Sequence, residues 1–322
     1  MKLSKKEVEK VCELYNLGKL KSFKGIKGGL SNHNFLIESE KGKFILRGIG
    51  QKITPHKRKR LETEFELMKF LDQNKFPYFT PLPIENILGK ILHEFNGKNF
   101  WIYKRLPGKS IIKFSPKKGD KLIKEMAKAL ATYHKYSEKF KKKKSGFQNY
   151  LKWVLEITEA INPKNTNDKT DELASKEKEF FKKIILRELK NNYSRNVLLL
   201  HSDLDPSNAL SQNDKVVSII DFDDAEYGPR ARDIAISLRD IGTVRNKLDK
   251  RITKIFLREY EKINKISKEE KNEILNLMLV ENAAFFSLAY NSMKKEKHNR
   301  LKYMQEMSKL SHNIINGGKL LE

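Results

Sequence analysis

The first hundred residues carry the apolar and polar alternation that is typical of β-strands. Apolar positions recur through FLIES (35–39) and KFILRG (43–48), on either side of a Lys41-Gly42 turn. Such alternation predicts half-buried strands, so we expect a β-hairpin here, after an amphipathic helix at 4–16. A second hairpin is predicted in ILHEFNGKNFWIYKRL, because Asn96-Gly97 favours a tight two-residue turn.

Helical spacing places the apolar residues of KRLETEFELMKFLDQ (59–73) on one face and predicts a helix there. After Leu106-Pro107-Gly108, helical patterns dominate from residue 119 onward. They recur at 147–160, 174–192, 229–262 and 267–310. The one β-like interruption has strand patterns at 197–200 and 216–220. We therefore predict an α+β chain with a small β-rich lobe at 1–106 and a larger helical lobe at 107–322.

Length and composition agree with two packed lobes in a reducing compartment. The chain has 322 residues, of which 39% are hydrophobic, and a single cysteine, Cys12. One cysteine excludes an intramolecular disulfide, and residues 1–15 lack the apolar segment of a signal peptide. No run approaches the roughly 18 apolar residues that span a bilayer. We expect a cytoplasmic protein with no membrane segment.

The formal net charge of +25 invites a nucleic-acid hypothesis. However, lysines are spread through nearly every segment, and only 56–60 and 141–144 are dense. No aromatic-interleaved strand, paired-cysteine motif or helix-turn-helix spacing accompanies them. We therefore expect a solvated basic surface and no specific nucleic-acid partner.

Acidic residues gather in one segment of this basic chain, HSDLDPSNALSQNDKVVSIIDFDD (201–224). Asp203 and Asn208 lie on a turn, and Asp221 ends the strand that follows. Amide and carboxylate oxygens are the hard ligands that Mg²⁺ takes, and a further carboxylate can accept a hydroxyl proton. These are the components of phosphoryl transfer. Each residue alone would suit a structural turn, but the joint pattern favours catalysis.

The segment HSDLDPSNAL…VVSIIDFDDAEYGPRARDIA resembles the catalytic segment of the aminoglycoside phosphotransferase, choline kinase and homoserine kinase superfamily. These are small-molecule kinases with a protein-kinase-like, two-lobed fold. GGLSNHNFLI followed by GKFILRG is similar to their nucleotide loop and next strand, and ALATYH to a shared helix. The amino-terminal region is most similar to that of the type II homoserine kinases.

The resemblance implies ATP and Mg²⁺ as cofactors and a role for each matching residue. Asp203 would be the catalytic base, and Asn208 and Asp221 would hold Mg²⁺. His201 and Asp233 would support the loop. The residues implied on the nucleotide side are Gly28, Gly29, Ser31, Asn32, Arg47, Glu64, Lys104, Arg105 and Leu106.

Three departures from the family pattern affect these roles. Arg47 stands where the phosphate-binding cation is usually Lys; it keeps the charge and offers bidentate contacts. Its ion-pair partner would be Glu64, with Glu62 as the alternative. Ser202 replaces a common Gly.

The third departure is an acid, Asp205, two residues after the base, where protein kinases carry Lys. With three further acids close by in the sequence, it suggests an acceptor that bears a positive charge; the alternative is that these side chains face solvent. The candidate acceptor residues are Asp205, Asp223, Asp224 and Glu226.

The leading functional hypothesis is therefore a kinase for the hydroxyl group of a small, amine-bearing metabolite, with homoserine first. Choline, another amino alcohol or an aminoglycoside are alternative acceptors. A catalytically silent, kinase-shaped protein that binds polyanions is the alternative of another class. Protein kinase activity is disfavoured, because no activation segment separates Asp221 from Tyr227-Gly228-Pro229.

Overall fold

The computed structural model describes residues 3–26, 32–50, 52–95, 97–111, 119–141, 146–165, 167–193, 196–292 and 297–317. It divides into two compact units. The first holds Met1–Lys109, Leu210–Gln212 and Val217–Asp223, and the second holds Ser110–Ala209, Asn213–Val216 and Asp224–Glu322. Among the described helices, none combines the length and the apolar character needed to cross a membrane.

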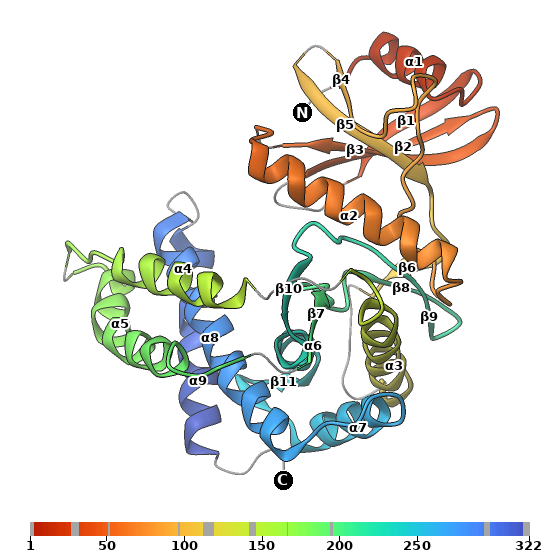
Figure 1. Cartoon of the computed structure of the whole chain (residues 1–322). Helices are drawn as coiled ribbons and strands as arrows, with labels where there is room; N and C mark the ends of the chain where they lie inside the picture. The colour runs from red at the N-terminus through yellow and green to blue at the C-terminus, as the bar shows by residue number, and fades with distance from the viewer. Residues whose placement is uncertain are drawn as a thin grey trace. The chain divides into compact units, whose positions relative to one another are not determined.

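A five-stranded antiparallel sheet forms the centre of the first unit, in the order β1-β2-β3-β5-β4 (Figure 1). The strands are β1 (Leu20–Ile26), β2 (Asn32–Ser39), β3 (Gly42–Ile49), β4 (His93–Phe95) and β5 (Lys98–Lys104). Both predicted hairpins are present. The turn of the first lies at 40–41, one residue before the expected place, and the strands of the second flank Asn96-Gly97.

One helix covers each face of this sheet. Helix α1 (Lys5–Leu14) packs Val8, Val11 and Cys12 onto Phe35, Ile37 and other apolar side chains of β2, β3 and β5. Helix α2 (Pro55–Gln73) packs on the opposite face, where Phe65 meets Trp101 edge-on at 5.2 Å between ring centroids. It begins four residues before the predicted start, because Thr54 caps its first turn and Pro55 fits the first helical position.

The register of β3 against β5 determines which face Arg47 occupies. Arg47 lies opposite Trp101, and Ile45 lies opposite Tyr103. Because alternate residues of a strand share a face, Arg47 lies on the side of the sheet that packs against α2. That helix carries Glu64 next to Phe65, so strand register brings a cation and a carboxylate to the same layer.

The second unit is built mainly from helices. They are α3 (Asp120–Ser137), α4 (Phe147–Glu159), α5 (Lys169–Glu188), α6 (Arg230–Gly242), α7 (Lys250–Glu261), α8 (Lys268–Ser292) and α9 (Lys297–Asn316). Helix α8 packs against α4, α5, α6 and α9 (Figure 1). Its buried residues lie on all sides, as expected for a helix in the middle of a core.

Short strands complete the chain. The two predicted around the acidic loop are β7 (Val197–Leu200) and β9 (Lys215–Ile219). The structure adds β6 (Lys109–Ser110), β8 (Ala209–Gln212), β10 (Glu226–Pro229), β11 (Thr243–Val244) and β12 (Lys247–Leu248). Strand β10 pairs with β7, so Glu226 lies opposite Leu200.

The helical pattern expected over 229–262 is present as two helices, α6 and α7, with an interruption between them. Strands β11 and β12 form a hairpin between α6 and α7, joined by Arg245 and Asn246. Both of these residues have left-handed backbone conformations, with φ of 50° and 60°, as a tight hairpin turn requires. The helix expected at 174–192 lies instead at Lys169–Glu188, where Asp168 caps its first turn.

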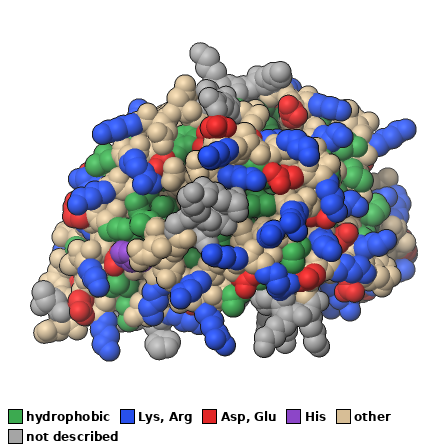
Figure 2. Space-filling model, turned by 90° about the horizontal axis from the view of Figure 1, so that it is seen from below, with side chains coloured by type: hydrophobic (Ala, Val, Ile, Leu, Met, Phe, Trp, Pro, Cys, Tyr) green, Lys and Arg blue, Asp and Glu red, His purple; other side chains and the backbone are tan. Residues whose placement is uncertain are grey.

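Charge on the surface is mixed. Figure 2 shows one face of the molecule, on which Lys and Arg side chains are interspersed with acidic and apolar ones over the whole view. The basic excess of the sequence is therefore spread over this face, with no single basic patch on it.

Candidate active site

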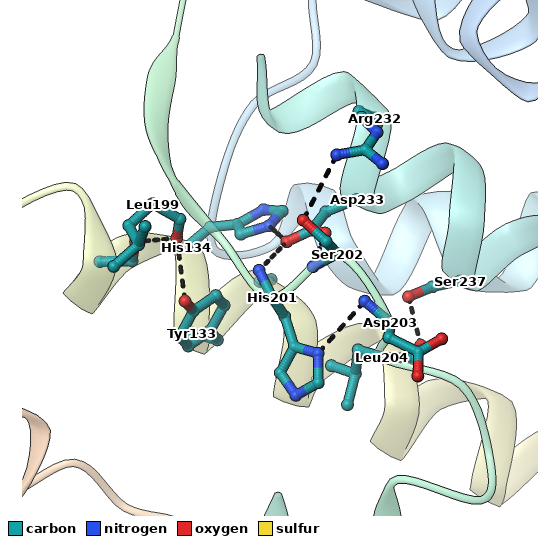
Figure 3. Close-up of polar contacts among 12 residues, drawn as sticks. Tyr133, His134, Leu199, His201, Ser202, Asp203, Leu204, Arg232, Asp233 and Ser237 are labelled. Atoms are coloured by element: carbon teal, nitrogen blue, oxygen red, sulfur yellow. Dashed lines mark hydrogen bonds and ion pairs between the residues drawn. The ribbon is translucent and has the colours of Figure 1, made fainter. Parts of the chain in front are cut away.

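The loop that follows β7 is tied to α6 through one buried carboxylate (Figure 3). Asp233 is 1% exposed and accepts hydrogen bonds from the backbone N–H groups of His201, at 2.8 Å, and Ser202, at 2.7 Å. His134 of α3 adds a third contact through Nε2, at 3.0 Å. The structure thus brings together His201 and Asp233, the two residues predicted to support the loop.

Electrostatics keep Asp233 ionised. Burial alone would raise the pKa of this carboxyl, but the hydrogen bond to His134, electrostatic attraction to His134 and His201 and the backbone hydrogen bond from His201 lower it below the ordinary value. An ionised carboxylate accepts backbone N–H bonds more strongly than a neutral acid, so the charge itself holds the loop. His134 is in turn held by the hydroxyl of Tyr260, at 2.6 Å from Nδ1.

The backbone at position 202 has a conformation that Gly adopts more readily than other residues. Ser202 has a φ of 65°, in the left-handed region that costs a residue with a Cβ atom free energy. The conformation turns its N–H group toward Asp233. Its hydroxyl lies 3.4 Å from Nη1 of Arg232, the residue before Asp233 on α6.

Asp203 and Asn208 are joined directly. The side-chain Nδ2 of Asn208 donates to the carboxylate Oδ2 of Asp203 and to its backbone carbonyl, at 2.8 Å in each case. Asp203 donates its own N–H to Nδ1 of His201, at 3.3 Å. Because the amide nitrogen of Asn208 is used in this way, its Oδ1 is left as an oxygen ligand for a cation.

Asp205 serves the loop itself, which differs from the acceptor role predicted for it. Its Oδ1 accepts hydrogen bonds from the N–H and hydroxyl of Ser207, both at 2.6 Å, and from the N–H of Asn208, at 3.0 Å. This side-chain turn holds Asn208 at its place after Asp203. The structure therefore favours a loop-stabilising role for Asp205.

In the first unit, Arg47 is buried among acids. Its guanidinium contacts Asp221 at 2.5 Å and Asp223 at 3.0 Å. Burial alone would lower the pKa of Arg47, but the charges of these two carboxylates raise it above the ordinary value, so the side chain stays charged. Asp221 has a φ of 69° and keeps 36% of its side chain exposed.

Asp223, one of the predicted acceptor residues, contacts Arg47. Its carboxylate accepts a hydrogen bond from the side chain of Asn32 and lies 4.0 Å from Nζ of Lys57. Its backbone carbonyl accepts from Arg60 at 2.5 Å. Burial opposes ionisation of Asp223, but the charges of Arg47 and Lys57 outweigh it and lower its pKa.

Glu64, and not Glu62, is the acid of α2 that faces Arg47. Glu64 is 3% exposed, whereas Glu62 is exposed to solvent. The direct ion pair predicted between Glu64 and Arg47 is absent from the described contacts, where Asp221 and Asp223 occupy the guanidinium. Burial raises the pKa of Glu64 to about 8, and the negative charge of Asp223 adds to the rise against the opposing charge of Arg47.

The other predicted residues differ in how the structure places them. Gly28, Gly29 and Ser31 lie outside the described residues. Lys104 ends β5, and the backbone N–H of Arg105 donates to the carbonyl of Lys43 at 2.9 Å, which leaves Leu106 as the candidate backbone donor of that segment. Asp224 is exposed, and Glu226 forms an ion pair with Arg232.

Sequence reasoning missed the charged network around Arg232. Arg232 is 5% exposed and pairs with Glu281 of α8 at 2.7 Å as well as with Glu226. The hydroxyl of Tyr150, on α4, donates to the same Glu281 oxygen at 2.8 Å. The only signal was an Arg next to Asp233 in RARDIA, since the partners lie far away along the chain.

The donor set suits Mg²⁺. Asn208 and Asp221, the two predicted ligands, offer an amide and a carboxylate oxygen, which are hard ligands. Within the described residues, no group of three or more His, Cys, Asp or Glu side chains gathers as a metal site. Each of the two side chains, Asn208 in the second unit and Asp221 in the first, thus has the chemistry of a Mg²⁺ ligand.

Comparisons with known proteins agree with this chemistry. The sequence pattern of the phosphotransferase enzyme family matches residues 22–265. The chain is 26% identical to the homoserine kinase of Methylobacillus flagellatus over 257 residues, which cover 80% of this chain and 75% of the relative.

Solved structures show the same fold. An amicoumacin kinase in complex with AMP-PNP, Ca²⁺ and Ami superposes with a TM-score of 0.71 and 16% identity, covering 95% of this chain and 93% of the other. A spectinomycin phosphotransferase solved with ADP and spectinomycin gives a TM-score of 0.70 and 16% identity, with full coverage of both chains. The predicted α+β, kinase-like fold and the family resemblance are confirmed. The protein therefore belongs to the phosphotransferase enzyme family and is a small-molecule phosphotransferase.

Proposed function

We propose that this phosphotransferase uses ATP and Mg²⁺ to phosphorylate the side-chain hydroxyl of homoserine. The observation that carries the proposal is the double hydrogen bond from Asn208 to Asp203, on a loop anchored by Asp233. It fixes a carboxylate beside an amide oxygen, as a base beside a metal ligand requires. The similarity to homoserine kinases supports the choice of acceptor.

In this proposal Asp203 accepts the proton of the acceptor hydroxyl as its oxygen attacks the γ-phosphorus of ATP. The bond between that phosphorus and the β–γ bridging oxygen breaks, and ADP leaves. A base aligned in advance removes the need to order it during the reaction. Asn208 contributes this alignment, because both of its donor contacts end on Asp203.

The nucleotide would be held mainly by residues of the first unit. Arg47 would bind phosphate oxygens, and the backbone of Gly28, Gly29, Ser31 and Asn32 would cover them. The segment Lys104, Arg105 and Leu106 would bind adenine through its main chain. Asn208 and Asp221 would hold Mg²⁺, which when bound neutralises phosphate charge. We also propose a cytoplasmic location. Thiols stay reduced there, which is compatible with the free thiol of Cys12.

The test is ADP release by the purified protein with Mg·ATP and a panel of homoserine, choline, ethanolamine and kanamycin. We expect homoserine to give the highest kcat/KM and a product heavier by one phosphoryl group in mass spectrometry. A clear preference for choline or ethanolamine would replace homoserine with an amino alcohol. Release of ADP with none of the four, although Mg·ATP binds, would reject this acceptor class.

The alternative of a silent polyanion-binding protein makes the opposite predictions. It requires retention on heparin above about 0.5 M salt, because many phosphate-like contacts must form at once. It also requires that no acceptor stimulate ADP release. Elution at low salt together with acceptor-dependent turnover would reject it.

A further inference from the structure

The buried guanidinium of Arg232 holds two carboxylates at the edge of the catalytic loop. Its Nε donates to Glu281 Oε1 at 2.7 Å, and its Nη1 pairs with Glu226 Oε1 and lies 3.4 Å from the Ser202 hydroxyl. The ring of Tyr150 lies 3.8 Å from the guanidinium carbon, and its hydroxyl donates to Glu281. Residues of α4, β10, α6 and α8 thus meet around Arg232, which contacts Ser202, the residue before Asp203.

The charges in this cluster do not balance. Arg232 is the ion-pair partner of both Glu226 and Glu281, and neither acid forms a second ion pair within the residues that the structure describes. Two carboxylates on one guanidinium leave one negative charge in excess. An unbalanced charge beside a buried group is costly, so the cluster favours a bound cation.

Only one of the two acids is open to a ligand. The side chain of Glu281 is 4% exposed, whereas that of Glu226 is 39% exposed. In the described part of the chain, neither Oε2 atom accepts a hydrogen bond. Glu281 is therefore the buried partner of Arg232, and Glu226 is the partner whose side chain solvent can reach.

An exposed aromatic ring lies in the same neighbourhood. Trp153, one turn after Tyr150 on α4, is 39% exposed, and the two ring centroids lie 5.6 Å apart. An ammonium ion is attracted both by a carboxylate and by the face of an indole ring. Tyr150 connects this indole to the acidic cluster, because its ring contacts Arg232 and its hydroxyl donates to Glu281.

Glu226 lies beside the loop that carries Asp203, so an amine bound there would be part of the phosphate acceptor. Strand pairing sets Glu226 opposite Leu200, and Arg232 links it to Ser202, which precedes Asp203. The other predicted acceptor acids are less suitable, because Asp205 closes its own loop and Asp223 pairs with Arg47.

We infer that Glu226 binds the ammonium group of the acceptor, while Arg232, Glu281 and Tyr150 position its carboxylate. The substrate class is then a short amino alcohol or hydroxy amino acid whose hydroxyl reaches Asp203 while its amine stays on Glu226. This inference rests on the proposed function, since it needs a hydroxyl acceptor. It goes further by naming the group that selects the acceptor.

The experiment compares acceptors that differ in the amine, using wild type, Glu226→Gln and the control Glu156→Gln. Glu156 is an exposed acid one turn after Trp153 on α4, and within the described residues it forms no ion pair or hydrogen bond with Arg232, so its variant removes the same charge without removing a partner of that residue. The acceptor pairs are homoserine with 4-hydroxybutyrate, and 3-aminopropan-1-ol with propan-1-ol. KM and kcat are measured for each acceptor and KM for ATP, with the melting temperature as the control for folding.

We expect Glu226→Gln to raise KM for the amines at least about tenfold, as loss of one charge-assisted contact implies. KM for ATP and the melting temperature should stay at the wild-type values, and Glu156→Gln should change nothing. Propylamine, which has the ammonium group but no hydroxyl, should compete with the acceptor in wild type and lose this effect in Glu226→Gln.

Equal KM values for the amines in the two variants would overturn the inference, as would equal use of the deaminated analogues by wild type. Turnover of 4-hydroxybutyrate or propan-1-ol but of neither amine would also overturn it and would leave a hydroxyl kinase standing. Absence of ADP release with every acceptor would instead reject the proposed function, so the two failures can be told apart.

Discussion

Asn208 holds Asp203 at two points, with its Nδ2 at 2.8 Å from both the carboxylate Oδ2 and the backbone carbonyl. A side chain that binds both the functional group and the backbone of its neighbour restrains rotation about the bonds between them. Asp203 is therefore aligned before an acceptor arrives, and replacements at this place should affect turnover more than folding.

Asp203→Asn tests the base directly. The variant keeps the shape of the loop but cannot take up a proton, so we expect kcat to fall by about 10²- to 10⁴-fold. Binding of Mg·ADP, measured by calorimetry, should stay as in wild type. Turnover within about threefold of wild type would show that another group accepts the proton.

Asp233→Asn tests the anchor of the loop. Loss of a buried, ionised acceptor of three hydrogen bonds should lower the free energy of unfolding by about 2–4 kcal/mol in urea at pH 7. Asp214→Asn, on a side chain that is 82% exposed, is the matched control and should change little.

The same variant makes a prediction about pH. The pKa of Asp233 is lower in the folded than in the unfolded chain, so its contribution is present above the ordinary value of 3.8 and is lost as pH falls through the folded pKa. Wild type should therefore lose stability on acidification below about pH 4, and the stability curve of Asp233→Asn should be flatter there. Parallel curves would contradict this role.

Glu64→Gln should have a pH effect of the opposite sign. Burial raises the pKa of Glu64 to about 8 from an ordinary 4.5, so between these values the folded chain holds a proton that the unfolded chain releases. Wild type then loses up to about 1.4 kcal/mol of stability per pH unit as pH rises through this window. The variant lacks this loss, so its stability relative to wild type should grow from pH 5 to pH 8.

The matched control for that experiment is Glu62→Gln. Glu62 lies on the same helix but is exposed, and its replacement should leave the pH dependence of unfolding unchanged. If both variants followed wild type across pH 5–8, Glu64 would be ionised in the folded chain.

Cys12 should resist thiol reagents while the chain is folded. It is 1% exposed, and burial, with the negative charges of Glu13 and Glu9, raises its pKa to about 11. Only about one thiol in a thousand is then ionised at pH 8, and the thiolate is the reactive form. Iodoacetamide should label the single cysteine within minutes in 6 M urea (roughly the unfolding range) and hardly at all without it. Equal labelling would mean that α1 opens readily from the sheet.

Local signals account for what the sequence predicted well. The turn near Gly42 and the pairing of β4 with β5 were predictable because each hairpin depends on a few adjacent residues. The hairpin that turns at Arg245 and Asn246 was missed because its two turn residues include neither Gly nor Pro. Helical spacing of apolar residues also continues on both sides of it. The loop from His201 to Asn208 was predictable because its chemistry is contained in one segment.

The ion-pair partners of the acidic residues could not be predicted, because they lie on segments that are distant along the chain. Asp223 and Glu226 are three residues apart in one acidic run, yet Asp223 pairs with Arg47 and Glu226 with Arg232. Nothing in their spacing distinguishes the two. The network around Arg232 uses Tyr150 and Glu281, which lie on helices α4 and α8, and only packing brings them together.

The hydrogen bonds of Asp233 also determine how the loop behaves in time. Backbone amides of loops commonly exchange their hydrogen with solvent through small local openings. The amides of His201 and Ser202 donate to a carboxylate that is 1% exposed and is held by His134 of another helix. Their exchange requires that α6 separate from the loop, so it should be as slow as exchange in the helical core. The segment that leads into Asp203 is then irregular in backbone shape but as persistent as the scaffold around it.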